Sequence, residues 1–382
     1  MDRSIKPYIR KFWHFVLRTL KSVSRTSSPV LPLNPKRILL LNGAHIGDIV
    51  ISTALLPVLR SAYPEAEIGF ATARWSQAIV RNNPLISYHH RIDHSKLNRE
   101  DSSWFARQLR YWRTRRQALK EIRRLSYDIS ISLYPWRPDF LFLVWQAKIP
   151  IRVAFSRTLW APLATHLAEY PEQNPLLSQG LCQIELLRSI GIGDHHLKLR
   201  RSSLAPSDEQ SIQEICTLLG VQTLESVQFS IVHMGAGTQT RELPISFWRE
   251  FATMHTVPLL VFTGKGRREA ENIEQAISGL PHCVNACDKL SWNGFVAAMR
   301  HADILFGVES MAVHVAAAVG TPCTAVYSGI GGPSRWRPEG KHCTVWTNAV
   351  PCSPCGRYYG CADMTCMKSF TPQHLLALLP QK

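Results

Sequence analysis

From residue 37 onward, short apolar runs alternate with longer amphipathic stretches, and this alternation begins a second time after residue 210. The first half is expected to contain strands at 37–42, 66–73 and 127–134 and helices at 47–62, 75–82 and 181–192. Continuously apolar strands separated by helices are typical of parallel sheets that helices cover on both faces. The pattern therefore predicts an α/β protein.

The second half repeats this arrangement with strands and helices of its own. Strands are expected within 227–237, 258–266, 303–308 and 322–329, and helices at 245–255, 268–278, 292–302 and 310–320. The polar stretch 200–210 contains a proline and indicates a linker between the two halves. Two Rossmann-like domains that face a cleft are therefore expected, with functional residues in the turns after the carboxyl ends of the strands.

The length of 382 residues suits this division. We expect a basic amphipathic segment at 1–35, a first domain at 36–205 and a second domain at 206–382 that ends in a cysteine-rich tail. No apolar stretch is long enough to cross a bilayer, and no secretory signal is apparent. A reducing compartment is therefore expected.

The net charge of +16 is concentrated in two short segments. Residues 1–37 carry a net charge of +8 and residues 102–127 a net charge of +7. Such segments could bind nucleic acid, an anionic membrane or a phosphorylated substrate. Because the remaining chain is nearly neutral and its strand-end turns carry small residues, a nucleic-acid-binding protein with a cysteine-bound metal is the less favoured alternative.

Both basic segments are expected to be helices with an apolar side. The first, around Trp13, could lie in a membrane interface or pack on its own domain. The second could meet an anionic partner or be a solvated helix. Its apolar side chains at helical spacing are Phe105, Leu109, Trp112, Leu119 and Ile122.

The stretch "NGAHIGDIVISTALLPVLR" joins the first expected strand to the first expected helix. Gly43 and Gly47 do not match the G-x-G-x-x-G dinucleotide motif, and Asp48 stands in the first turn of the helix. A carboxylate there could stabilise the helix dipole or act as a general base at the floor of a cleft.

The turns after the second-half strands carry small residues and side chains that suit phosphate. Gly235, Thr238 and Arg241 belong to "HMGAGTQTREL", and Gly264 and Glu269 belong to "TGKGRRE" one strand later. Glycine lets a backbone approach a ligand closely, and threonine and arginine donate hydrogen bonds to phosphate oxygens. These residues are candidates for a phosphate-binding site.

The stretch "GVESMAVHVAAAVGTP" places Glu309, Ser310 and Met311 between a strand and a helix, with His314 one turn further on. The N–H groups at such a helix start suit a pyrophosphate. Glu309 could equally be a cap and His314 a packed histidine. No D-x-D motif for a nucleotide-bound metal occurs, so Arg241 and the helix dipoles would balance the phosphate charge.

Four of the ten cysteines gather in "CSPCGRYYGCADMTCM", at Cys352, Cys355, Cys361 and Cys366. A C-x2-C pair followed by two more cysteines indicates structural zinc, iron or paired thiols. The spacing is tighter than in a common zinc ribbon, so all three possibilities stay open. The six other cysteines are expected to be ordinary buried thiols.

Taken in this order, the motifs resemble those of glycosyltransferase family 9, which includes the ADP-heptose-using heptosyltransferases of lipopolysaccharide synthesis. The likeness spans residues 36–370 and rests on "RILLLNGAHIGDIVISTALLPVLRSAYPEAEI", "GVESMAVHVAAAVGTPCTAVYSG" and the cysteine-rich tail. It implies the GT-B fold, with the acceptor bound by the first domain and the nucleotide-sugar by the second.

The resemblance also implies roles for the candidate residues. Asp48 matches the family's catalytic base in an inverting, metal-independent transfer that needs no cofactor. The expected donor is ADP-heptose, and the expected acceptor is a phosphorylated glycolipid at the cytoplasmic face of the inner membrane, without nucleic acid as a partner. The donor-binding candidates are Gly235, Thr238, Arg241, Gly264, Glu269, Glu309, Ser310, Met311 and His314. The acceptor-binding candidates are Arg113, Arg116 and Arg137.

Three positions depart from the usual family pattern. Arg241 stands where lysine is common, and Glu309 and Met311 stand in place of the aspartate and glycine of an Asp-Thr/Ser-Gly motif. A side chain at Met311 adds bulk where phosphate approaches the backbone. The alternatives are therefore a GT-B transferase for another nucleotide-sugar, a related epimerase, or an inactive relative that binds nucleotide-sugars.

Overall fold

The computed structural model describes residues 29–97, 102–134, 140–158, 160–174, 176–255, 259–331 and 334–376. The chain divides into two compact units, Met1–Ser203 and Leu204–Lys382. The division falls within an irregular stretch, residues 200–208, that the sequence indicates as a linker. The expected acceptor and donor roles of the two parts stay predictions.

The first unit is built on a six-stranded, all-parallel sheet with the order β3-β2-β1-β4-β5-β6. Its strands are β1 (Arg37–Leu41), β2 (Glu67–Thr72), β3 (Tyr88–Arg91), β4 (Ile129–Ser132), β5 (Ile151–Phe155) and β6 (His166–Ala168). This is the strand order of a Rossmann fold, so the predicted α/β class is confirmed.

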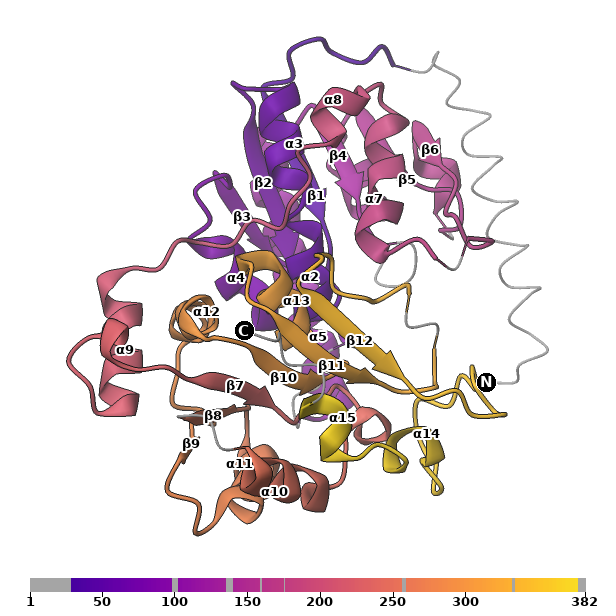
Figure 1. Cartoon of the computed structure of the whole chain (residues 1–382). Helices are drawn as coiled ribbons and strands as arrows, with labels where there is room; N and C mark the ends of the chain where they lie inside the picture. Colours follow the sequence, from indigo (N-terminus) through magenta and orange to yellow (C-terminus); the bar gives the residue numbers. More distant parts are fainter. Residues whose placement is uncertain are drawn as a thin grey trace. The chain divides into compact units, whose positions relative to one another are not determined.

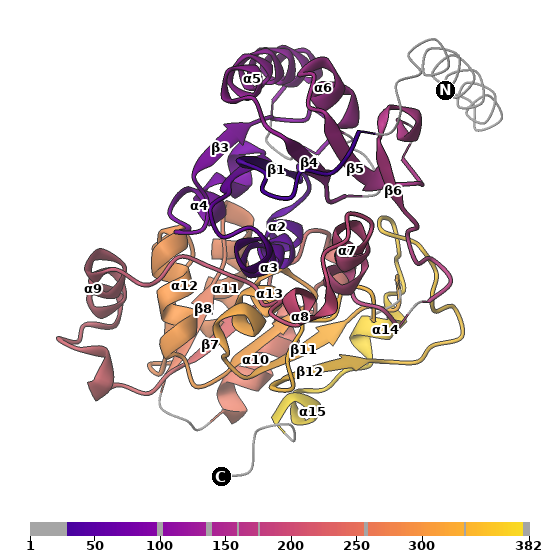
Figure 2. The ribbon, with the colours of Figure 1, turned by 90° about the horizontal axis from the view of Figure 1, so that it is seen from above.

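Helices cover both faces of the first sheet. They are α2 (Ile46–Ser52), α3 (Leu55–Ala62), α4 (Gln77–Arg81), α5 (Trp104–Leu125), α6 (Leu141–Gln146), α7 (Gln179–Arg188) and α8 (Asp194–Leu197), with short 3-10 turns η1 (Arg74–Ser76) and η2 (Ala161–Leu163). Figure 2 shows α5 and α6 on one face of the sheet and α2, α3 and α7 on the other. Ala118 and Ile122 of α5 pack with Leu39 and Leu41 of β1 in a buried cluster.

The expected helix at 47–62 is broken after Ser52 into α2 and α3. Pro57 has no N–H to donate to the carbonyl of Thr53, and its ring crowds that carbonyl. Instead, the N–H of Leu56 donates to the Thr53 carbonyl at 3.1 Å, which tightens the turn. The break keeps α2 short, and Asp48 lies in its first turn.

The second unit repeats the same topology. Its parallel sheet has the order β12-β11-β10-β7-β8-β9, which is the order of the first sheet with each strand replaced by its counterpart. Its strands are β7 (Ser230–His233), β8 (Leu260–Thr263), β9 (Cys283–Asn285), β10 (Leu305–Val308), β11 (Cys323–Tyr327) and β12 (Cys343–Thr347). The prediction of two parallel-sheet units is confirmed.

The helices of the second unit also form two layers. They are α9 (Glu209–Leu219), α10 (Ile245–Met254), α11 (Arg267–Ile277), α12 (Trp292–His301), α13 (Met311–Val319), α14 (Thr365–Lys368) and α15 (Pro372–Leu376), with 3-10 turns η3 (Leu224–Ser226) and η4 (Gln239–Arg241). Figure 1 shows α10 and α11 below the sheet and α12 and α13 above it. The core under α10 is aromatic, with Trp248, Phe251 and Phe306 fully buried.

Sequence reasoning missed the edge strands of both sheets and also β5, which lies between β4 and β6. β3 has the sequence Tyr-His-His-Arg, and β6 and β9 have three residues each. Edge strands are short and half-covered, so they lack the continuous apolar run that reveals a central strand.

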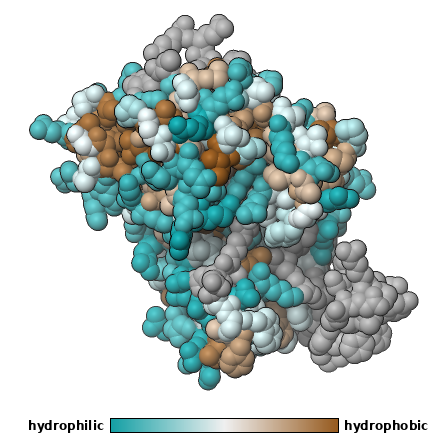
Figure 3. Space-filling view, turned by 90° about the horizontal axis from the view of Figure 1, so that it is seen from below, coloured by the Kyte–Doolittle hydropathy of each residue, from teal (hydrophilic) through white to brown (hydrophobic). Residues whose placement is uncertain are grey.

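No helix of the described residues is long and apolar enough to cross a membrane. On the face shown in Figure 3, hydrophobic residues lie in separate groups among hydrophilic ones. The expected N-terminal helix around Trp13 falls outside the described residues.

Candidate active site

The candidate residues lie where the strand order reverses in each sheet. In the first unit this point is between β1 and β4, and in the second it is between β7 and β10. Ligands of open α/β sheets bind beyond the carboxyl ends of the strands at such points. Asp48 follows β1, Arg241 follows β7 and Glu309 follows β10, so the structure places all three at these positions.

Asp48 stands in the first turn of α2 and is 8% exposed. Its Oδ2 accepts the backbone N–H of His45, the residue before the helix, at 3.0 Å. Asp48 therefore caps its own helix, as one of the two sequence interpretations expects. A carboxylate carries two oxygens with several lone pairs, so this bond is compatible with a second role as a base.

A buried amide and hydroxyl network holds the turn that carries Asp48. The Asn42 Nδ2 donates to the Ser52 Oγ at 2.8 Å, and the Gln183 Nε2 donates to the same oxygen at 2.9 Å. The Ser52 hydroxyl donates to the Asp48 carbonyl at 2.8 Å. The Asn42 Oδ1 also accepts the N–H of Ala44 at 3.0 Å. These buried hydrogen bonds favour one geometry for the turn.

Sequence reasoning missed this network. Asn42 directly after the apolar run 38–41 was the available signal, because a buried amide requires partners. Ser52 and Gln183 could not be found in the same way, since Gln183 comes from α7, 131 residues beyond Ser52.

In the second unit, Arg241 ends the short turn η4 and faces the residue after β10. Its Nη1 lies 3.4 Å from the Glu309 Oε1, a loose ion pair in which both side chains are largely buried. The Glu309 Oε2 accepts the hydroxyl of Ser328 at 3.3 Å. Burial raises the pKa of Glu309, and Arg241 and Ser328 oppose that rise. Glu309 is thus a partner of Arg241 and not merely a helix cap.

Two hydrogen-bonding atoms at this point have no partner among the described residues. They are the Nε of Arg241 and the Oγ of Ser310, and both atoms are buried. Ser310 is the N-cap residue of α13, yet its side chain makes no capping bond, and Met311 is the first helical residue. Buried donors without partners are costly unless something binds them. Together with the N–H groups of the helix, they suit an anion.

His314 lies in α13 and is 9% exposed. Burial lowers its pKa to about 4, so the ring is neutral at physiological pH. The same cause lowers the pKa of His233 at the end of β7 to about 4, and its Nδ1 lies 3.0 Å from the Thr263 hydroxyl. The interpretation of His314 as a packed histidine therefore fits its surroundings.

The Glu269 carboxylate lies against Gly235 and Gly264 and leaves no room for a side chain at either position. A Cβ on Gly235 would stand 2.4 Å from the Glu269 carboxyl carbon, and one on Gly264 would stand 2.8 Å from a carboxyl oxygen. The same carboxylate accepts the N–H of Lys265 at 3.0 Å. Burial raises the pKa of Glu269. The glycines therefore make room for a carboxylate that joins two strand-end loops.

A second acid in these loops was missed from the sequence. Glu242 accepts the N–H of Ala236 at 3.1 Å and pairs with Arg268 through two bonds of 2.7 Å. Thr238, a donor candidate, lies 3.2 Å from the Thr240 hydroxyl. The loop after β7 is therefore tied to α11 by a two-bond ion pair, and no local motif marks that pairing.

The acceptor candidates Arg113 and Arg116 lie on the outer side of α5, away from the buried Ala118 and Ile122. Both are exposed, and neither makes an ion pair with a described residue. Arg137 lies outside the described residues. The structure therefore brings two of the three together, in the middle of one helix.

The first half of α5 also leaves its apolar side uncovered. Trp104 is 67% exposed, Phe105 71% and Trp112 60%, whereas Ile122 is buried. Arg115 lies between, with its guanidinium 5.7 Å from the ring of Phe142 on α6. The predicted apolar stripe therefore packs only along its C-terminal half.

The four clustered cysteines are free thiols that differ in burial. Among the residues that the structure describes, no three His, Cys, Asp or Glu side chains are placed to hold a metal ion. Cys352 is exposed, while Cys366 is buried with Met367 and Phe370 in the second core. The prediction of a zinc or iron site at these cysteines therefore gains no support from the described residues and stays a prediction. Of the six other cysteines, Cys283 and Cys343 are only half-buried.

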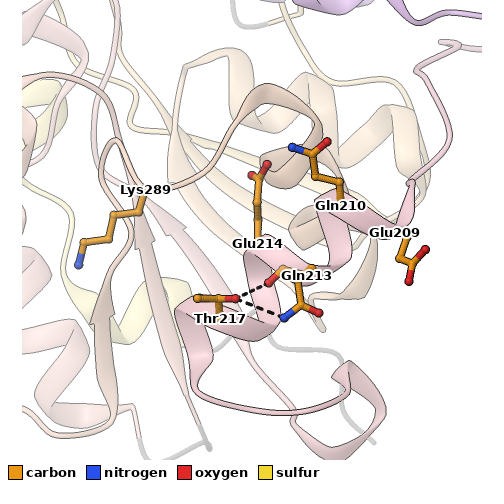
Figure 4. A pocket seen from close by; sticks show the side chains of 6 residues that line it. All are labelled: Glu209, Gln210, Gln213, Glu214, Thr217 and Lys289. Carbon is orange, nitrogen blue, oxygen red and sulfur yellow. Dashed lines mark hydrogen bonds between the residues drawn. The ribbon is translucent and has the colours of Figure 1, made fainter.

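A pocket of about 600 Å³ lies in the second unit, apart from all the candidate residues. Figure 4 shows Gln213 and Thr217 of α9 joined by hydrogen bonds on one side and Lys289 on the other. Glu214 in its lining accepts the N–H of Ser291 at 2.9 Å and so supports the start of α12. These polar residues therefore stabilise helices of the second unit.

Comparison with known proteins bears on this chemistry. Residues 206–363 match the model of glycosyltransferase family 9 (heptosyltransferase). The chain is 21% identical over 304 residues to lipopolysaccharide heptosyltransferase 3 of Escherichia coli, covering 76% of this chain and 83% of the relative.

Solved structures share the fold. A family 9 glycosyltransferase from Veillonella parvula superposes with a TM-score of 0.71 at 20% identity, covering 92% of this chain and 97% of that one. The ADP-heptose LPS heptosyltransferase II of E. coli gives a TM-score of 0.68 at 18% identity, with 89% and 96% covered. Two parallel Rossmann-like units with these neighbours constitute the predicted GT-B fold. Residues 206–363 are thus similar to the heptosyltransferases of glycosyltransferase family 9, and the chain shares the fold of solved glycosyltransferases of that kind.

Proposed function

We propose that the chain transfers heptose from ADP-heptose to a phosphorylated glycolipid acceptor, with inversion at the anomeric carbon and without a metal ion. The observation that carries this proposal is the cluster of unsatisfied donors at the carboxyl ends of β7 and β10. Arg241 and Ser310 each keep a buried hydrogen-bonding atom without a partner among the described residues, next to the start of α13.

The donor diphosphate would bind at this cluster. A guanidinium and a helix N-terminus each stabilise phosphate, and the buried surroundings strengthen both interactions. The heptosyltransferase WaaC of E. coli, a structural neighbour with a TM-score of 0.67 at 13% identity, has been solved with ADP. That complex supports an adenine nucleotide as the donor's leaving group in a protein of this fold.

Asp48 would act as the base. As the bond between the sugar and the phosphate breaks, the acceptor hydroxyl attacks the anomeric carbon from the opposite side and its proton passes to the Asp48 carboxylate. The network of Asn42, Ser52 and Gln183 would hold the carboxylate in place. A fixed base gains rate because no reorganisation is needed at the moment of transfer.

The leaving diphosphate would be stabilised by Arg241 and the α13 N–H groups in place of a metal ion. In this arrangement Glu309 neutralises Arg241 until the donor arrives. Burial raises the pKa of Glu309, which means that its charged form is disfavoured there. Its carboxylate is therefore a weaker partner for Arg241 than the donor diphosphate. The diphosphate would then displace Glu309 as the principal partner.

The acceptor would meet α5. Eight Lys and Arg residues and one Glu in 102–127 give a field that attracts a phosphorylated glycolipid or an anionic membrane. The exposed Trp104, Phe105 and Trp112 supply apolar surface beside that charge. Aromatic and basic residues together are the composition of helices that bind at a membrane interface, which for this chain would be the cytoplasmic face of the inner membrane.

The test is mass spectrometry of transfer products across a panel of nucleotide-sugars, with a phosphorylated lipid A-type glycolipid as the acceptor. We expect product from ADP-heptose in EDTA, with no gain on adding Mg²⁺. Product from another donor alone would contradict heptose, and activity that returns only with Mg²⁺ would contradict the metal-independent mechanism.

A second candidate function is binding of a nucleotide-sugar without transfer. The side chain of Met311 at the first position of α13 and the carboxylate of Glu309 beside Arg241 favour it, since both occupy the phosphate approach. Calorimetry would then show ADP binding while no donor in the panel gives a product.

A further inference from the structure

We infer that Tyr358, in the cysteine-rich segment, is a positioning residue that holds the Arg241 guanidinium for the donor diphosphate. This inference rests on the proposed donor site. It gives the cysteine-rich segment a part in donor binding that does not depend on its thiols.

The segment is anchored on the carboxyl end of β11. The N–H of Cys355 donates to the Gly329 carbonyl at 3.2 Å, and the N–H of Gly356 donates to the Ile330 carbonyl at 2.9 Å. Gly329 permits this close approach, because a Cβ there would lie 3.0 Å from the Ser353 hydroxyl and 3.2 Å from Cys366. The segment therefore lies beyond the carboxyl end of β11 and reaches the loop after β7.

Two contacts join Tyr358 to that loop. Its carbonyl accepts the hydroxyl of Thr240 at 2.9 Å, and its ring lies under the neighbouring Arg241, with 5.3 Å from the guanidinium carbon to the ring centroid. The backbone bond holds the segment against η4, and the ring contact places the guanidinium over the Tyr358 ring. One residue thus contacts two consecutive residues of η4.

Orientation matters here because the remaining contacts of Arg241 are weak. Its pair with Glu309 is 3.4 Å long, and its Nε has no partner among the described residues. A free arginine side chain loses much rotamer freedom when it binds phosphate. A ring that already stacks on the guanidinium removes part of that loss before the donor arrives, and it adds a cation–π attraction.

The ring, not the hydroxyl, carries the effect. The Tyr358 hydroxyl makes no hydrogen bond with a described residue, and even a Cβ added at Gly331 would stay 3.9 Å from it. Phenylalanine should therefore replace tyrosine without loss, whereas leucine keeps apolar volume but has no π face. Tyr359, the next residue, is 79% exposed and provides a matched control on the same segment.

The experiment measures ADP affinity by calorimetry, and donor KM and kcat, for Tyr358→Phe, Tyr358→Leu, Tyr358→Ala and Tyr359→Ala in the full chain. We expect Tyr358→Ala and Tyr358→Leu to weaken ADP binding and raise donor KM about three- to tenfold. Tyr358→Phe and Tyr359→Ala should match the wild type, and kcat should change little.

A double-mutant cycle with Arg241→Ala separates this inference from the proposed function. If Tyr358 acts through Arg241, adding Tyr358→Ala to Arg241→Ala should have no further effect on ADP affinity. Equal losses in both backgrounds, or a loss in Tyr358→Phe as large as in Tyr358→Ala, would overturn the inference alone. Unchanged ADP affinity in Arg241→Ala would overturn the donor site itself.

Discussion

The two units share one strand order, yet the loops at their strand ends are held by different chemistry. In the first, neutral amides and hydroxyls surround the turn that carries Asp48. In the second, ion pairs and glycines shape the loops around Arg241 and Glu309. Neutral amides and hydroxyls hold the turn that carries one carboxylate, whereas the charged loops of the second unit suit a site for an anion. The shared topology therefore places both loops at the carboxyl ends of strands, and the local polar groups determine which chemistry each loop supports.

The helices that cover the two sheets differ in how far their aromatic side chains are buried. α10 buries Phe247, Trp248 and Phe251 against its sheet, whereas α5 leaves Trp104 and Phe105 exposed. A helix that keeps aromatic side chains in water carries a cost in hydrophobic free energy unless a partner covers them. The first unit therefore has an outward-facing surface of a kind that α10 lacks.

The substitution with the largest expected effect is Asp48→Asn, in the first unit. The substitution removes the base but keeps an oxygen that can accept the His45 N–H, so the helix cap and the melting temperature should be retained. We expect kcat to fall about a hundredfold or more, with ADP affinity unchanged. Stopped-assay kinetics and calorimetry measure the two quantities. A nearly normal kcat would leave Asp48 with the capping role alone.

The corresponding change in the second unit is Arg241→Ala. Loss of a charged hydrogen bond to the diphosphate should weaken ADP binding by about 1.5–3 kcal/mol, or roughly 10- to 150-fold. Arg267→Ala is the matched control, since Arg267 is exposed and pairs only with Glu271 among the described residues. Equal affinities for the two variants in calorimetry would remove the diphosphate from this site.

The α5 surface can be tested by reversing its charge. The double variant Arg113→Glu and Arg116→Glu should raise the KM for a phosphorylated glycolipid about five- to tenfold, with the effect shrinking at high salt. Arg113→Lys with Arg116→Lys keeps the charge and should behave like the wild type. Salt-independent losses in the reversed variant would indicate a folding defect instead.

The N-terminal segment provides the complementary test. Residues 1–37 carry a net charge of +8, so deleting residues 1–30 should abolish co-sedimentation with anionic liposomes while transfer to a soluble acceptor continues. The charge-reversed α5 variant should still co-sediment with anionic liposomes but should transfer poorly to the acceptor. If the intact chain does not bind anionic liposomes at low salt, the membrane proposal is wrong.

The smallest expected effect concerns pH. Burial raises the pKa of Glu309, so this carboxyl takes up a proton at a higher pH than an ordinary glutamic acid. As the pH falls through that raised pKa, the negative charge beside Arg241 disappears and ADP affinity should rise about twofold to threefold. Glu309→Gln should lack this component while keeping the titration of ADP itself. Identical pH profiles for the two proteins would contradict the assignment.

The same proton uptake sets the sign of the stability effect. The native state holds the proton on Glu309 more tightly than the unfolded chain does, so stability rises as the pH falls through this window. The free energy of unfolding of Glu309→Gln should therefore vary less with pH there. Urea unfolding at several pH values measures the difference.

Most central strands could be predicted because each contains a continuous apolar run, as in β1 and β10, but β5 was missed because Arg152 interrupts its short run. The edge strands could not, since the Tyr-His-His-Arg sequence of β3 has no such run. The break after Ser52 could have been read from Pro57, whose missing N–H leaves the Thr53 carbonyl without an ordinary helical partner.

The candidate site divides similarly. Asp48, Arg241 and Glu309 could be found because each stands in a local motif directly after a strand. Tyr358 could not, since its contact with Arg241 joins positions 117 residues apart and depends on where Gly329 lets the chain return. Contacts of that kind arise from the folded topology, and no short stretch of sequence encodes them.

The carboxylate of Glu269 beneath Gly235 and Gly264 has a consequence for how such sequences diverge. Alanine at Gly235 would collide with that carboxylate, so the substitution becomes tolerable only after position 269 has shortened. A screen for second-site suppressors of Gly235→Ala should therefore recover serine or alanine at position 269. In sequences descended from this chain, we therefore expect Glu269, Gly235 and Gly264 to be retained together or replaced together.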